Sequence, residues 1–139
     1  MTFEERLSEM GVFKARYVAV IGPESMSQDV AQLCLRRGNE VLMYGRGQES
    51  LNQGEYSNYF VLSEEKGQNR WANLNDASIV IILKCNLDII EEILFAVKPF
   101  SLVIVIGPID SAIKDMDFYS TVHLKNLELK FLSLLSERV

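Results

Sequence analysis

The residues best placed to do chemistry form a turn between an apolar segment and an amphipathic one. Gly22 and Pro23 follow the apolar segment, and Ser25 and Ser27 stand where a helix would begin. The start of a helix offers free backbone N–H groups and the positive end of the helix dipole, which together attract anions. The turn is therefore a candidate phosphate site, to which the two serine hydroxyls would add hydrogen-bond donors.

Glu24 counts against a phosphate at this turn. In a dinucleotide-binding turn of the form G-x-G-x-x-G, the second and third glycines would fall where Glu24 and Ser27 stand. Two like unit charges about 4 Å apart repel by about 1 kcal/mol in water and about 4 kcal/mol at an effective dielectric constant of about 20. If a dinucleotide binds, glycines restored at positions 24 and 27 should strengthen its binding. In the alternative interpretation, Gly22 and Pro23 only end the strand, and Glu24 and Ser25 stabilise the helix start.

Arg46 is the best single candidate for selecting a ligand. It follows the second predicted strand, where an acidic residue would bind a ribose hydroxyl and an arginine would favour a 2′-phosphate. No Asp or Glu stands at this strand end, which reads Tyr44-Gly45-Arg46. Any bound dinucleotide is therefore predicted to be NADP. The alternative is an arginine that lies in solvent on a loop.

Two further strand ends carry candidates. Cys85 follows Lys84, which would lower the pKa of the thiol, although a cysteine here can also simply pack. Gly107 and Ile109 follow the fifth predicted strand. His123 is the only histidine and has no Ser, Cys or Asp partner at motif spacing. We therefore assign no catalytic residue and no metal ligand.

Six segments have the composition of strands. The fourth and fifth are almost wholly apolar, which is typical of parallel strands covered on both faces. The last, from Leu127 to Leu132, alternates polar and apolar residues and is predicted to lie at a sheet edge. The predicted strands are residues 17–21, 40–44, 59–62, 78–83, 102–106 and 127–132.

Helices are predicted between the strands. Apolar residues recur at helical spacing in 26–37 and 87–97, and more weakly in 70–74. Thr2 and Glu5 fit a capping box that would open a short helix and make residue 1 a natural start. We predict one α/β domain: a three-layer, doubly wound parallel sheet, Rossmann-like, with strand order 3-2-1-4-5-6. It would span residues 16–139, with the helix of residues 1–15 packed on it.

Composition excludes several classes of function. The chain has 139 residues, the size of one domain, with 48% hydrophobic residues and a net charge of -5. The acidic balance and scattered basic residues argue against nucleic-acid binding. No apolar run approaches the roughly 20 residues that span a bilayer, and the N-terminus lacks a signal peptide. We therefore expect a cytoplasmic protein with no membrane contact, with reduced cysteines and no metal site.

The order and spacing of these segments resemble the cofactor domain of zinc-type (medium-chain) alcohol and sugar dehydrogenases. The resemblance runs from about Gly11 to Leu135. It is carried by Val18-Ala-Val-Ile-Gly22, by Gly38-Asn-Glu-Val, by the fourth strand, by Leu102-Val-Ile-Val-Ile-Gly107, and by the tail of residues 117–131. No one of these motifs is highly specific alone.

The resemblance implies roles for several residues. Gly22 matches the first glycine of the family's phosphate turn, and Arg46 stands where NADP-preferring members place an arginine. Gly107 and Ile109 would approach the nicotinamide through backbone atoms. The last strand would pair with its copy in a homodimer. The chain departs from the family at positions 24 and 27, and it has no room for the separate domain that carries metal ligands and most substrate contacts.

Two hypotheses follow. In the first, the chain is a dinucleotide-binding domain of an oxidoreductase, of NADP(H) type and not catalytic alone, with chemistry supplied by a partner chain. In the second, it is a catalytically inactive structural or dimerisation module that keeps the fold and no longer binds a dinucleotide.

Overall fold

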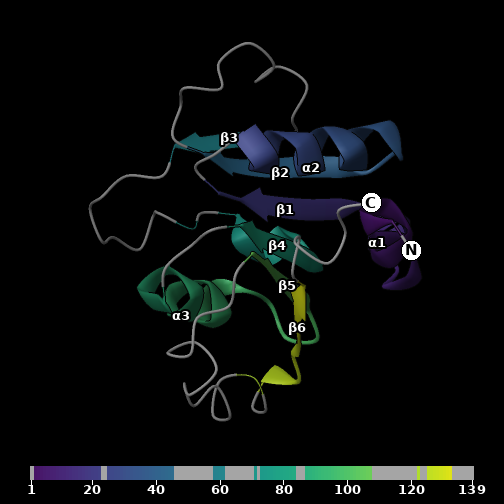
Figure 1. The fold of residues 1–139 in the computed structure, drawn as a ribbon. Helices are drawn as coiled ribbons and strands as arrows, with labels where there is room; N and C mark the ends of the chain where they lie inside the picture. The colour runs from purple at the N-terminus through teal and green to yellow at the C-terminus, as the bar shows by residue number, and fades with distance from the viewer. Residues whose placement is uncertain are drawn as a thin grey trace.

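Six parallel strands form one sheet in the order β3-β2-β1-β4-β5-β6 (Figure 1). The computed structural model describes residues 2–22, 25–45, 58–61, 71, 73–83, 87–107, 122 and 125–132. All five neighbouring strand pairs are parallel. The strands are β1 (Tyr17–Ile21), β2 (Glu40–Gly45), β3 (Asn58–Val61), β4 (Ile79–Leu83), β5 (Leu102–Ile106) and β6 (Glu128–Leu132).

The observed sheet confirms the predicted doubly wound topology, and β6 lies at an edge as expected. Four strands differ from their predicted bounds by one residue: β2 ends one residue later, β4 and β6 begin one residue later, and β3 is Asn58–Val61 and not 59–62. The weak helix predicted over 70–74 lies partly outside the described residues. The described helical turn there is a 3-10 helix, η4 (Leu74–Asp76), which Asn73 precedes in the left-handed conformation.

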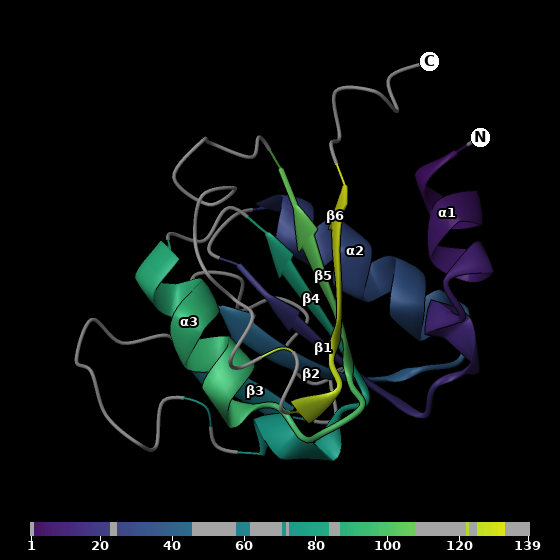
Figure 2. The same ribbon diagram turned by 90° about the horizontal axis from the view of Figure 1, so that it is seen from below.

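Helices cover both faces of the sheet, as Figure 2 shows. On one face lie α1 (Phe3–Glu9), the 3-10 helix η1 (Val12–Lys14) and α2 (Ser25–Arg36), which pack against strand residues such as Val18 and Val20. On the other face, η4 and α3 (Leu87–Ala96) pack against the alternate strand residues, such as Ala19 and Ile21. Side chains alternate between the faces of a strand, so strands covered on both sides must be apolar throughout.

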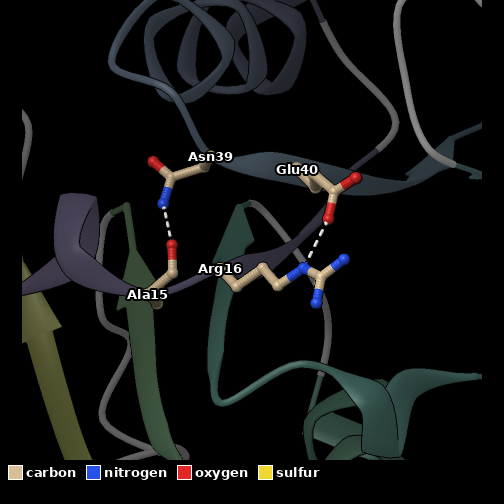
Figure 3. A network of polar contacts seen from close by, with 4 residues as sticks. All are labelled: Ala15, Arg16, Asn39 and Glu40. Atoms are coloured by element: carbon tan, nitrogen blue, oxygen red, sulfur yellow. Dashed lines mark hydrogen bonds and ion pairs between the residues drawn. The ribbon is translucent and has the colours of Figure 1, made fainter.

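The segment before β1 is fixed at the amino ends of the strands. Thr2 Oγ1 accepts a hydrogen bond from Glu5 N at 3.1 Å, which confirms the predicted N-cap of α1. Asn39 donates from Nδ2 to Ala15 O at 2.5 Å, as Figure 3 shows. It also donates to Val12 O at 3.1 Å. Beside it, Arg16 Nε and Glu40 Oε2 form an ion pair at 3.0 Å, also drawn in Figure 3. These contacts join η1 and the start of β1 to the start of β2.

Lys125 holds the end of α3. Its Nζ donates to Leu94 O at 3.1 Å, to Val97 O at 3.0 Å and to Phe95 O. Leu94 and Phe95 belong to the last turn of α3 and Val97 directly follows it, at the end of the helix where the dipole favours a cation. Burial lowers the pKa of Lys125. The lysine in the turn before the last strand thus joins α3 to β6.

Candidate functional site

The carboxyl ends of four strands lie level with one another. Ile21 at the end of β1 is in register with Tyr44 on β2 and with Ile82 on β4. Leu83 at the end of β4 is in register with Ile106 on β5. The chain order reverses between β1 and β4, which is the switch point where parallel α/β sheets bind ligands. The turns that leave these strands define the candidate site.

Gly22 has little room for a side chain, because three atoms crowd the position that its Cβ would take. Its N–H donates to Tyr44 O at 3.1 Å, so the residue continues the pairing of β1 with β2. A Cβ built on Gly22 would lie 3.0 Å from Leu83 O, 3.2 Å from Leu83 Cβ and 3.1 Å from Ser27 Cβ. These distances are shorter than ordinary van der Waals contact. The glycine therefore lets β1, β4 and α2 meet at the switch point.

Ser27 is fully buried in the first turn of α2. Its hydroxyl donates to Gly22 O at 3.0 Å, which ties the helix to the end of β1. A serine hydroxyl has one proton, so in this arrangement Ser27 donates to the protein. The sequence placed Ser27 as a phosphate donor and did not reveal this bond. The available signal was its position, since the third glycine of a dinucleotide turn is the one that packs against the strand.

Gly107 needs glycine for a different reason. Its φ is +132°, a backbone conformation that other residues rarely adopt. Its N–H donates to Leu132 O at 3.0 Å and so extends the pairing of β5 with β6. Among the described residues, no atom lies within 4 Å of the position that its Cβ would take. The backbone at the end of β5 is therefore bare, and no described atom lies close to the place where a side chain would begin.

The structure brings together some of the predicted site residues. Gly22 and Ser27 are in direct contact, and Ser25 begins α2 beside them. Gly107 also lies at the carboxyl ends of the strands, where it follows β5, and β4 stands between β5 and the strand that Gly22 follows. Four further candidates lie outside the described residues: Pro23, Arg46, Cys85 and Ile109.

The α3 face of the sheet carries a polar group beneath the site. Tyr44 is fully buried at the end of β2, and burial, followed by the charge of Asp76, raises the pKa of its phenol. Its ring lies 5.7 Å from that of Trp71, measured between ring centres. Trp71 Nε1 donates to Glu92 Oε1 on α3 at 3.3 Å. Trp71 therefore connects α3 with the end of β2.

In the described part of the chain, no group of three or more His, Cys, Asp or Glu side chains could hold a metal ion. None of the helices described is long and apolar enough to cross a bilayer. Cys34 is buried in α2, and burial raises the pKa of its thiol to about 12.

Sheet order, switch point and covering helices define a Rossmann-like α/β fold. Solved structures share it. S. aureus TarJ in complex with NADPH matches with a TM-score of 0.66 and 12% identity, over 93% of this chain and 40% of that chain. L-idonate 5-dehydrogenase from Escherichia coli matches with a TM-score of 0.61 and 12% identity, over 83% of this chain and 33% of that chain. A putative NADPH:quinone reductase from Mesorhizobium loti matches with a TM-score of 0.61 and 14% identity, over 94% of this chain and 41% of that chain.

At identities of 12–14%, these TM-scores show a shared fold alone. The chain spans well under half the length of each of these proteins. No protein-family model matches the sequence, and no curated protein matches it by sequence comparison.

Proposed function

We propose that the chain is a dinucleotide-binding domain of the dehydrogenase type, specific for NADP(H) and not catalytic alone. The observation that carries the proposal is the meeting of β1, β4 and the start of α2 at Gly22, at the switch point of the sheet. Of the structural neighbours, TarJ was solved in complex with NADPH, another is named as an NADPH:quinone reductase, and the third is a dehydrogenase. The zinc-type dehydrogenases remain the family that the sequence resembles.

The described residues fit a dinucleotide at two points. Gly22 closes the turn without a side chain, and α2 begins beside it, so the backbone N–H groups of its first turn are the candidate ligands of the pyrophosphate. Gly107 leaves backbone without a side chain at the β5 end, where a nicotinamide would approach together with Ile109. A bound dinucleotide would supply hydride transfer chemistry.

The remaining assignments rest on sequence. Arg46 would select the 2′-phosphate, and Pro23, Ser25 and Cys85 would line the same edge of the sheet. Catalytic groups would come from a partner chain, since no catalytic constellation is visible in the sequence. We further propose that residues 16–139 fold as one domain with residues 1–15 packed on it, and that the protein works in the cytoplasm.

The proposal is tested by isothermal titration of the protein with NADPH and with NADH. We expect saturable one-to-one binding that is at least tenfold tighter for NADPH, because Arg46 would pair with the 2′-phosphate. The variant Arg46→Ala should lose most of this preference while keeping NADH affinity. No heat with either nucleotide up to millimolar concentration would refute the proposal.

A second candidate function is a structural module that dimerises and binds no dinucleotide. It is favoured by the engagement of the Ser27 hydroxyl within the protein and by Glu24 at the phosphate turn. In both hypotheses we propose a homodimer formed by pairing of β6, in the segment from Leu127 to Leu132, with its copy. β6 lies at the sheet edge and its Phe131 is 36% exposed.

Thermal melting with and without NADPH separates these alternatives, and sedimentation equilibrium tests the dimer that both of them propose. The structural module predicts a dimer in which nucleotide changes neither stability nor mass. The variant Phe131→Lys should convert the dimer to monomer, because it places a charge on the paired edge. Nucleotide retained through purification would exclude the structural module.

A further inference from the structure

Ser27 stands where a dinucleotide turn has its third glycine, and its hydroxyl donates to Gly22 O at the start of the candidate phosphate turn. We infer that Ser27 is a positioning residue: its side chain holds the first turn of α2 against the end of β1, and the phosphate is bound by backbone N–H groups and not by the Ser27 hydroxyl. This inference rests on the proposed function, because it concerns how the same site is built.

The first argument is packing. In the glycine fingerprint, the third glycine allows the helix to approach the strand closely. Here the close approach is kept although position 27 has a side chain, since Ser27 Cβ lies only 3.1 Å from where a Cβ of Gly22 would be. Because Gly22 has no side chain, the Ser27 side chain fills the space beside it and has no exposed surface. The close contact between α2 and the end of β1 is therefore kept although position 27 is not glycine.

The second argument is hydrogen bonding. Ser27 Oγ donates to Gly22 O at 3.0 Å, and Gly22 N–H donates to Tyr44 O at 3.1 Å. Gly22 is thus bonded to α2 through its carbonyl and to β2 through its amide. A buried carbonyl that loses its donor is costly, so the first turn of α2 is not free to move relative to the strand end. The N–H groups of that turn are held in one place, as a preorganised anion site requires.

This arrangement reverses the expectation drawn from the glycine pattern for position 27. Replacement by glycine would remove the hydrogen bond and the packing contact, and it would add backbone freedom near the helix start. Ser27→Gly should therefore weaken dinucleotide binding, although it restores the motif. Ser27→Ala removes the hydrogen bond alone and should have the smaller effect.

Ser101 offers a matched control. It is also fully buried, and its hydroxyl also donates to a backbone carbonyl, Lys98 O, at 2.7 Å. It precedes β5 and therefore lies at the amino ends of the strands, at the opposite edge of the sheet. Ser101→Ala removes the same kind of bond from the same kind of environment, so it reports the general effect of lost stability.

The test compares the wild-type protein with Ser27→Ala, Ser27→Gly and Ser101→Ala. Affinity is measured by isothermal titration for NADPH and for adenosine 2′-monophosphate, which lacks the pyrophosphate. Backbone amide exchange is measured by NMR. We expect Ser27→Ala to weaken NADPH binding about five- to tenfold and Ser27→Gly to weaken it further. Both should speed exchange of the Gly22 amide, which donates to Tyr44 O and whose carbonyl accepts from Ser27. Adenosine 2′-monophosphate affinity should stay within about twofold, and Ser101→Ala should leave both affinities unchanged.

Five results would overturn the inference. NADPH bound as tightly or more tightly by Ser27→Gly would mean that the side chain obstructs the phosphate. Equal losses in both Ser27 variants with unchanged amide exchange would make the hydroxyl a direct ligand. Equal weakening of both nucleotides, or an equal effect of Ser101→Ala, would reduce Ser27 to general stability. A wild-type protein that binds no NADPH would refute the proposed function itself, and this inference with it.

Discussion

Gly22→Ala should destabilise the protein through steric conflict at the switch point. The added Cβ would lie 3.0 Å from Leu83 O, 3.2 Å from Leu83 Cβ and 3.1 Å from Ser27 Cβ. Ordinary contacts of a methyl group are several tenths of an ångström longer, so β1, β4 or α2 must shift. Leu83 O is backbone at the end of a buried strand and cannot rotate away. Overpacking of this kind costs about 1–3 kcal/mol, and we expect about 2 kcal/mol.

The assay is urea unfolding followed by circular dichroism, together with thermal melting. For 139 residues the unfolding entropy near the midpoint is about 0.3 kcal/mol/K, so about 2 kcal/mol lowers Tm by about 7 °C. Gly38→Ala is the control, because no described atom lies within 4 Å of its Cβ position and only its φ of +98° opposes alanine. It should cost about 1 kcal/mol. A Gly22→Ala protein as stable as the wild type would refute the close packing of the strand ends.

Three further substitutions test the ends of the fold and its core. Lys125→Met should cost about 1–2 kcal/mol and speed amide exchange at the end of α3, because three carbonyls lose a charged donor; unchanged exchange there would contradict the capping role. Asn39→Asp should be at least as destabilising in urea as Asn39→Ala, because an ionised carboxylate cannot donate to Val12 O and Ala15 O; the reverse order would contradict it. Burial raises the pKa of Cys34 to about 12 from an ordinary value of 9.0, so the stability that the protonated thiol contributes is complete below pH 9 and is lost as pH rises toward 12. Between pH 8 and 10.5, the free energy of unfolding in urea should therefore fall less steeply with pH for Cys34→Ala than for the wild type, by up to about 1.4 kcal/mol per pH unit. The same slope in both proteins would show that the thiol is not buried.

The sequence predicted the sheet well because the central strands β1, β2, β4 and β5 are buried on both faces. In β4 and β5 every residue or nearly every residue is apolar, and only a strand between two helical layers requires this. The alternation of polar and apolar residues in β6 likewise predicted its place at the sheet edge. Boundaries were less certain, since the residues at helix and strand ends satisfy more than one local preference. β3 shows this, shifted by one residue from its prediction.

The site was less predictable, because side-chain contacts between distant segments leave no local pattern. Gly22 was recognised as a turn residue, but its crowding by Leu83 depends on a strand that lies about 60 residues later in the chain. Ser27 was taken as a hydroxyl donor for a ligand, whereas its bond to Gly22 O follows from the path of the chain around the turn. The left-handed backbone of Gly107 was equally invisible, since nothing in its neighbours demands it.

An NMR titration with NADPH tests the central claim most directly, by mapping which backbone amides respond. If the carboxyl edge of the sheet binds the dinucleotide, the amide signals of Gly22, Ser27 and Gly107 should shift and saturate together. Asn39 and Ser101, at the amino ends of the strands, should stay in place. Shifts confined to the amino ends, or no saturable shift at millimolar NADPH, would contradict the account.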